Sequence, residues 1–121
     1  MKHNFRELQI WKNGIDIAVH TYQQCKTFPK EELFGLSAQM KKAAVSIPSN
    51  IAEGSGRGTN PQLVHFLDVA LGSACELETQ VLIAQKLHFL TEQDAEEWIA
   101  SIHQEQKQVR SFRDKIESGL L

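Results

Sequence analysis

The stretch that decides the fold is residues 39–57, which read QMKKAAVSIPSNIAEGSGR. Its apolar residues keep the spacing of one helical face: Met40, Ala43, Ala44, Ile47 and Ile51. Pro48 interrupts this helix, because proline lacks a backbone N–H and presses against the carbonyl of Ala44. We therefore expect a kink that packing holds in place, or a kink that shapes a surface for a partner. Gly54 is expected to end the helix as a left-handed cap.

Length and composition describe one ordinary globular domain, residues 1–121. The chain is 41% hydrophobic and 23% charged, and its net charge of -2 argues against a strongly basic nucleic-acid-binding domain. We see no signal peptide and no apolar run of the roughly 20 residues that a membrane span needs, so we expect a cytoplasmic protein without membrane contact. Cys25 and Cys75 are expected to be buried, reduced thiols rather than a disulfide.

Residues 5–27 show the spacing of a bundle helix that begins at an Asn4 cap, with Glu7 completing a capping-box-like start. Its expected inner stripe is Leu8, Trp11, Ile15, Ala18, Tyr22 and Cys25. The second helix is predicted to start between Lys30 and Gly35 and to run to Ala52 or Glu53. A third helix is predicted to start with Asn60 as its cap and Pro61 at its first position, and to stop near His88. Its inner stripe repeats every seven residues: Leu63, Leu67, Ala70, Ala74, Leu77, Val81 and Ala84.

The fourth helix is predicted to start at a Thr91 cap. Its expected inner face is Trp98, Ile102, Val109, Phe112 and Ile116, with Glu105 facing a partner or solvent. Four helices with short connections predict an all-α fold, an up-down-up-down antiparallel four-helix bundle. Gly72 stands among small residues of the third helix and costs up to about 1 kcal/mol relative to alanine. We expect another helix, of this subunit or the next, to approach it closely.

No known catalytic or metal-binding pattern is complete in this chain. Di-metal sites in four-helix bundles use Glu-x-x-His pairs, and no histidine here has a glutamate three residues before it. His65 and Asp68 are one turn apart, which is typical of a solvated helix face. Ser46, Glu53 and His65 would be the nearest catalytic candidates, but no spacing joins them. We therefore predict no catalytic residue, no metal and no cofactor.

The best basic cluster is Lys41, Lys42 and Arg57, which lie on or beside one helix. Three charges would make a weak, salt-sensitive contact with nucleic-acid phosphates, and a ring of subunits would multiply it. Unpartnered surface lysines are the plainer interpretation. The loop of residues 54–58 could likewise hold an anion or serve only as a flexible connector.

Several stretches together resemble a known family, the bacterial four-helix-bundle proteins called 23S rRNA intervening-sequence proteins. They are Trp11, Tyr22, Phe34-Gly35-Leu36 with Gln39, the run from Ala43 to Gly54, and Gly72-Ser73-Ala74-Cys75-Glu76-Leu77-Glu78-Thr79. The resemblance covers nearly the whole chain in order. Its most specific part is Ser-Ile-Pro-Ser-Asn-Ile-Ala-Glu-Gly, residues 46–54. We take the motif residues Ser46, Pro48, Asn50, Glu53, Gly54 and Gly72 as structural or assembly positions.

The resemblance implies a left-handed up-down bundle that assembles as a homopentameric ring, in a family whose members mostly have no established activity. A related branch, the accessory variability protein of diversity-generating retroelements, is a basic pentameric barrel that binds nucleic acid and a reverse transcriptase. This chain is slightly acidic, and its Lys41 and Lys42 stand where arginines are common. Our first hypothesis is a non-enzymatic, self-assembling scaffold or interaction module. The alternative is a ring that binds RNA or DNA as an accessory to ribosomal RNA or a reverse transcriptase.

Overall fold

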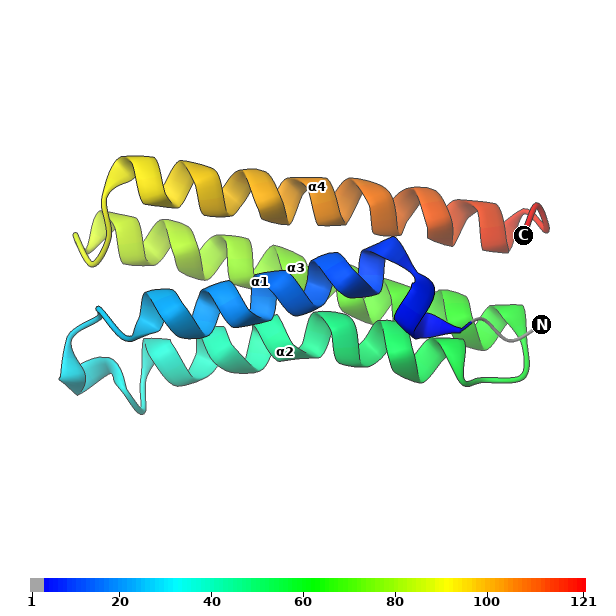
Figure 1. Cartoon of the computed structure of the whole chain (residues 1–121), viewed down its shortest axis with the longest axis horizontal. Helices are drawn as coiled ribbons and strands as arrows, with labels where there is room; N and C mark the ends of the chain where they lie inside the picture. Colours follow the sequence, from blue (N-terminus) through cyan, green and yellow to red (C-terminus); the bar gives the residue numbers. More distant parts are fainter. Residues whose placement is uncertain (1–3) are drawn as a thin grey trace.

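The structure, a computed structural model, describes residues 4–121 and contains only helices and turns in that range, with no strand. The elements are η1 (Phe5–Glu7), α1 (Gln9–Cys25), η2 (Lys30–Glu32), α2 (Leu36–Ser55), α3 (Asn60–Lys86) and α4 (Glu92–Glu117). Figure 1 shows the four long helices side by side, with η1 and the end of α4 at the same end of the molecule. The predicted all-α, four-helix fold is confirmed. Residues 1–3 of the predicted domain lie outside the described range.

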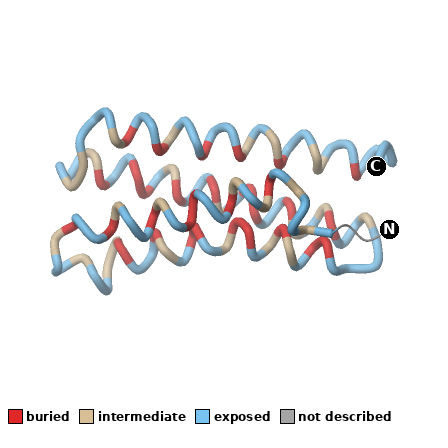
Figure 2. Tube along the Cα trace, viewed as in Figure 1, coloured by how far each residue is buried: buried red, intermediate tan, exposed pale blue. Residues whose placement is uncertain are grey.

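The core lies between the four helices, where buried positions recur along the inner side of each one (Figure 2). All seven residues of the predicted α3 stripe are buried. In α4 the predicted Trp98, Ile102, Val109 and Ile116 are buried, and Phe112 packs against the core while partly exposed. The seven-residue period of α3 was therefore a sound guide to its buried side.

The predicted stripe of α1 was only partly right. Ala18 and Cys25 are buried, and Leu8 and Trp11 pack against the core while partly exposed. The buried residues of α1 are Ile10, Gly14, Ile17, Ala18, Thr21 and Cys25. Ile15 and Tyr22 are exposed instead. A pattern of hydrophobic residues does not detect two of these buried positions. Gly14 has no side chain. Thr21 is polar, but it is compatible with the core because its hydroxyl donates to the Ile17 carbonyl at 2.8 Å.

Side chains cap three of the helices, though not always where the sequence suggested. Asn4 caps the short η1 through the Arg6 N–H, and α1 begins only after Leu8. Thr91 caps α4 as predicted, accepting from the Asp94 N–H at 3.0 Å. The cap of α3 is Thr59 rather than Asn60, which is the first residue of the helix. Threonine and asparagine can both cap a helix, because the side-chain oxygen of either one can accept from a backbone N–H of the first turn.

Gly54 is not a left-handed cap. Helix α2 continues to Ser55 and is capped by Gly56, so Gly54 lies inside the last turn and is buried. A Cβ atom on Gly54 would lie 2.8 Å from Cβ of Phe66 and 3.0 Å from Cδ1 of Leu63. The missing side chain therefore lets the end of α2 approach the start of α3. Pro48 lies within the same continuous α2, and the kink expected there stays a prediction.

The two cysteines have different surroundings. Cys25 is buried as expected, and burial raises the pKa of its thiol. Cys75 is exposed, so the prediction of a second buried thiol was wrong. Its neighbour Ala74 occupies the buried position of α3, and a step of one residue rotates the next side chain by about 100° toward solvent. Both thiols are free.

Gly54 and Gly72 provide a matched pair of substitutions. Gly54→Ala should lower the free energy of unfolding by about 1–3 kcal/mol, because the new methyl group overlaps Phe66 and Leu63. Gly72→Ala should raise the stability of a single chain by up to about 1 kcal/mol, because a Cβ atom there meets nothing within 4 Å. Urea unfolding measured at low protein concentration tests both values. Equal effects of the two substitutions would contradict the packing described for Gly54.

Candidate functional site

The serine and asparagine of the 46–54 motif join α2 to α3. The hydroxyl groups of Ser46 and Ser73 form a hydrogen bond of 2.7 Å between the helices. Asn50 donates through Nδ2 to the carbonyl oxygen of Ser46 at 2.7 Å and to its Oγ at 2.8 Å. These three polar side chains satisfy one another at a partly buried position, which fixes how α2 lies along α3. Ser46 and Asn50 thus take part in the contact between α2 and α3.

Pro48 takes part in a second junction, where α1, α2 and α4 meet. A Cβ atom on Gly14 would lie 3.1 Å from Cβ of Pro48 and 3.2 Å from Oε2 of Glu105. Gly14 thus leaves space that the proline ring of α2 and the carboxyl group of α4 fill from two sides. The lack of a side chain at Gly14 therefore makes this junction possible.

Glu105 does not face a partner or solvent, which corrects the prediction. It is 1% exposed, and neither carboxyl oxygen has a hydrogen-bond partner among the described residues. Burial raises its pKa from an ordinary value of 4.5 to about 8. The nearby Asn13 amide opposes this rise without cancelling it, because the desolvation caused by burial is the larger effect. The carboxyl group is therefore mostly protonated, and uncharged, at neutral pH.

The acidic residue of the motif has a local partner. Glu53 forms an ion pair of 3.1 Å with Arg57 one turn later, and both side chains are largely exposed. The guanidinium of Arg57 also lies over the ring of Phe66, 4.9 Å from its centre. An exposed pair of this kind contributes little to stability. It does hold Arg57 at the connection between α2 and α3, with part of its charge neutralised.

The three predicted nucleic-acid contacts do not gather in one place. Lys41 and Lys42 lie in the first half of α2, about 22 Å along the helix from Arg57. Nζ of Lys41 lies over the Tyr22 ring, 5.0 Å from its centre, and Lys42 is exposed. Of the three predicted contacts, Lys41 and Lys42 therefore lie together in one helical turn, and Arg57 lies apart from them.

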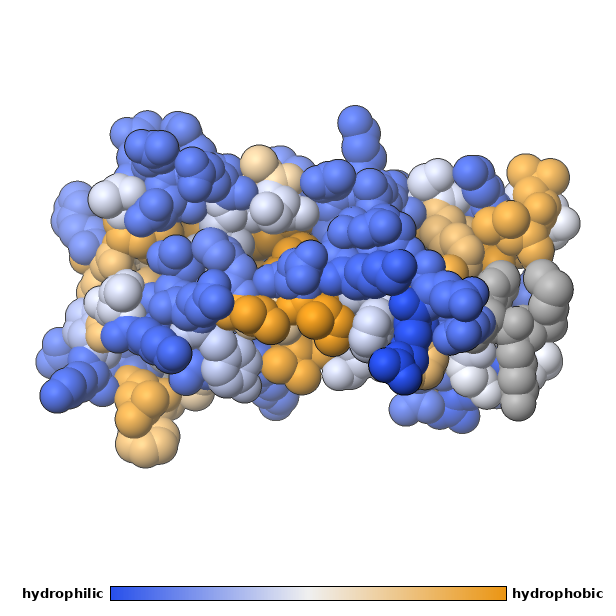
Figure 3. All heavy atoms as spheres, in the orientation of Figure 1, coloured by the Kyte–Doolittle hydropathy of each residue, from blue (hydrophilic) through white to orange (hydrophobic). Residues whose placement is uncertain are grey.

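An exposed apolar face lies on α1, on α2 and on the residues that connect them, and we call it the α1–α2 face. It consists of Trp11, Ile15, Val19, Tyr22, Leu33, Phe34 and Val45. Figure 3 shows apolar side chains at the surface over these helices. Phe34 is 92% exposed, Tyr22 is 46% exposed and Val45 is 41% exposed. Two surface hollows meet at Val45, one reaching Trp11 and Pro48 and the other reaching Tyr22 and Phe34.

A smaller exposed surface follows the outer side of α3. Val69, Leu82 and Ile83 are exposed there, and Gly72 lies between them with open space where a Cβ atom would be. No helix of the described chain approaches Gly72, so a close approach within one subunit is excluded for this position.

The polar residues considered as catalytic candidates have other partners. Ser46 is bonded to Ser73, Glu53 is paired with Arg57, and His65 packs edge-on against Phe66. Asp68, one turn from His65, accepts from Nε of Arg113 at 2.9 Å. Within residues 4–121, no group of three or more His, Cys, Asp and Glu side chains is arranged to hold a metal ion. His3 lies outside the described residues.

Comparison with known proteins shows both family and fold. The profile of the family described as 23S rRNA-intervening sequence protein matches residues 6–111. A crystal structure of a protein of unknown function, from the S23 ribosomal protein family of Bacteroides thetaiotaomicron VPI-5482, is similar to this chain with a TM-score of 0.81. It shares 21% sequence identity, over 87% of this chain and 95% of that one, so the likeness is one of fold. No curated protein matches the sequence. None of the helices in the described range is both long and apolar enough for a membrane crossing.

Glu105 makes stability depend on pH in a direction opposite to that of most carboxylates. Because its folded pKa is raised, the folded state holds a proton that the unfolded state releases between about pH 4.5 and 8. Stability should therefore fall as pH rises through this range, by at most about 1.4 kcal/mol per pH unit from this group. Glu105→Gln should flatten that dependence, and Glu96→Gln, an exposed carboxylate of the same helix, should not. Urea midpoints from pH 5 to pH 8.5 measure it, and identical slopes in wild type and Glu105→Gln would contradict the assignment.

Proposed function

The chain belongs to the 23S rRNA-intervening sequence protein family, and we propose that it is a non-enzymatic bundle that assembles with further copies of itself as a scaffold or interaction module. One observation carries the proposal: the exposed α1–α2 face. A single soluble domain rarely leaves so many large apolar side chains together at its surface unless something covers them.

The composition of the α1–α2 face is that of a contact between proteins. It combines Trp11, Tyr22 and Phe34 with aliphatic residues, and aromatic residues are enriched where proteins bind each other. Two cations, Lys41 and Lys42, also line the hollow that contains Phe34. An apolar centre with charge at the rim is the arrangement that excludes water from a contact.

A closed ring requires two different surfaces on each subunit, because every copy binds its neighbour head to tail. The outer side of α3 supplies a second surface, where the space beside Gly72 allows another helix to approach. The proposal therefore pairs the α1–α2 face of one copy with the α3 side of the next. The family resemblance suggests five copies. The same proposal includes an up-down-up-down, left-handed course of the four helices and a place in the bacterial cytoplasm.

The non-enzymatic part of the proposal is supported by the partners of the polar residues. Ser46 and Glu53 are each engaged with a neighbour, and neither is linked to His65. Ser46 is thus used in the contact between α2 and α3, and Glu53 is used in a local ion pair. We include no cofactor in the proposal.

A second candidate function is binding of RNA or DNA by the assembled ring. It is favoured by the position of Lys41 and Lys42 at the rim of the α1–α2 face, because each copy in a ring would place the same pair near a junction. The description of the family, which names an intervening sequence of 23S rRNA, makes RNA the first nucleic acid to test.

Self-assembly is tested by placing a charge in the centre of the face. Wild-type protein should have a mass in solution of about 68 kDa, five times the 13.7 kDa of one chain. Val45→Glu should shift it to the single-chain mass with unchanged helical circular dichroism, because Val45 is exposed and its replacement does not disturb the core. Leu120→Glu, an exposed apolar residue near the end of the chain, is the matched control. Light scattering that finds wild type as a monomer at micromolar concentration would overturn the proposal.

RNA binding is tested with wild type, Lys42→Glu and the exposed control Lys86→Glu in mobility-shift titrations at low and high salt. If the ring binds RNA through phosphates, raising the salt from about 50 to 200 mM should weaken wild type by tenfold or more. Lys42→Glu should weaken binding further than Lys86→Glu. Affinity that does not change with salt, or no binding at low salt, removes this candidate.

A further inference from the structure

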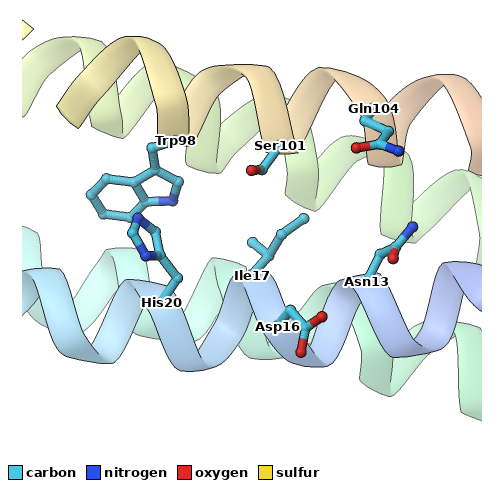
Figure 4. Close-up of a pocket in the computed structure, with 7 residues that line it drawn as sticks. All are labelled: Asn13, Asp16, Ile17, His20, Trp98, Ser101 and Gln104. Atoms are coloured by element: carbon cyan, nitrogen blue, oxygen red, sulfur yellow. The ribbon is translucent and has the colours of Figure 1, made fainter. Parts of the chain in front are cut away.

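A groove between α1 and α4 has the features of a small-molecule site that neither the sequence motifs nor the proposed assembly uses. Its volume is about 290 Å³, at the lower end of the range of ligand pockets. Figure 4 shows side chains of both helices around it. The groove is lined by Asp16, Ile17 and His20 of α1 and by Trp98, Ser101 and Gln104 of α4, among others.

The indole of Trp98 supplies a buried donor without an acceptor. The residue is 1% exposed, and its Nε1–H has no hydrogen-bond partner in the described part of the chain. Figure 4 shows this nitrogen directed toward the space between His20 and Ile17. The half-buried His20 ring packs edge-on against the indole, 5.2 Å away between ring centres. An unpaired buried donor costs free energy, and a ligand oxygen that accepts from it would recover that cost.

Asp16 supplies the charge of the groove. It is exposed at the rim, and it is the one acidic side chain among the described residues that line the groove. Neither Asp16 nor His20 has a hydrogen bond or ion pair with any residue in the range 4–121, so both are available. Asn13, by contrast, is already held by Gln9 and Gln108 at 2.8 Å each. An ionised carboxylate only accepts hydrogen bonds, so it selects a donor, most strongly a charged one.

We propose that this groove binds a small protonated amine that also carries a hydrogen-bond acceptor. The ammonium group pairs with Asp16, the acceptor oxygen takes the hydrogen of Trp98 Nε1–H, and the carbon skeleton between them lies on Ile17. His20 turns away from the indole to let the oxygen reach the nitrogen. An ammonium without an acceptor leaves the indole unpaired, and an acceptor without an ammonium leaves the carboxylate unused, so the site discriminates by both groups.

The site is independent of the proposed assembly. The groove residues of α1 lie about 140° around the helix from the centre of the α1–α2 face, at 100° per residue. Covering that face therefore does not require covering the groove. A failure of the assembly test leaves this proposal standing, and the reverse also holds.

The probe is tyramine, in which an ammonium and a phenol oxygen stand at opposite ends of an aromatic skeleton. Phenethylamine lacks the oxygen, and tyrosol has a hydroxyl in place of the ammonium. ¹H–¹⁵N correlation spectra of the full-length protein report the indole N–H of Trp98 directly, and Trp11→Phe identifies which of the two indole signals belongs to it. Tyramine titrated to about 10 mM should shift that signal in a saturable manner.

Asp16→Asn should weaken tyramine binding by about tenfold or more, because it replaces a charged acceptor with a neutral amide. Glu96→Gln, an exposed carboxylate of α4 outside the groove, should leave it unchanged. Phenethylamine and tyrosol should each bind more weakly than tyramine to the wild-type protein, a comparison that needs no variant. No shift of the Trp98 signal, an equal shift in Asp16→Asn, or equal binding of all three compounds would overturn the proposal.

Discussion

The structure depends on how closely helix α2 can approach the helices on either side of it. Two glycines set those distances. Gly14 of α1 leaves space for Pro48, and Gly54 of α2 itself leaves space for Phe66 of α3. Between these two points, the Ser46–Ser73 hydrogen bond fixes the position of α2 along α3. A proline is tolerated within α2 because its ring is buried in this arrangement. Residues of the 46–54 motif thus let the backbone of α2 lie close to α1 and to α3.

The sequence predicted the helices well where burial follows hydrophobicity alone. The α3 stripe is made of Leu, Val and Ala at a regular spacing, and all of it is buried. Prediction failed where space rather than polarity decides burial. Gly14 contributes no hydrophobic signal, and Thr21 becomes a core residue only through a bond to its own helix. The cap of α3 is Thr59, one residue before the predicted Asn60. Both residue types can cap a helix, so the sequence alone does not show which of the two has the backbone conformation of a cap.

The candidate site was predictable in part. The motif residues Ser46, Asn50 and Pro48 were identified from their order in the chain, and the structure supplies their contacts. Glu105 was misplaced because a glutamate is rarely buried without a partner. Its position between Ile102 and Val109 on the inner stripe was the signal available in the sequence. The α1–α4 groove lay beyond sequence reasoning, since it combines residues about 80 positions apart whose proximity depends on the packing of the whole bundle.

Helix α1 is apolar on two sides, and this has a consequence for how the chain folds. Ile10 and Ile17 face inward, while Trp11, Ile15 and Tyr22 form a second apolar set about 130° around the helix, at 100° per residue. A rotated docking of α1 would satisfy hydrophobicity almost as well, but it would withdraw Gly14 from Pro48 and Thr21 from its buried position. The orientation of α1 therefore depends on Gly14 and Thr21, two residues that are not hydrophobic. The sequence of α1 is thus locally frustrated, because two of its sides could face the core. Gly14 and Thr21 favour one of the two orientations.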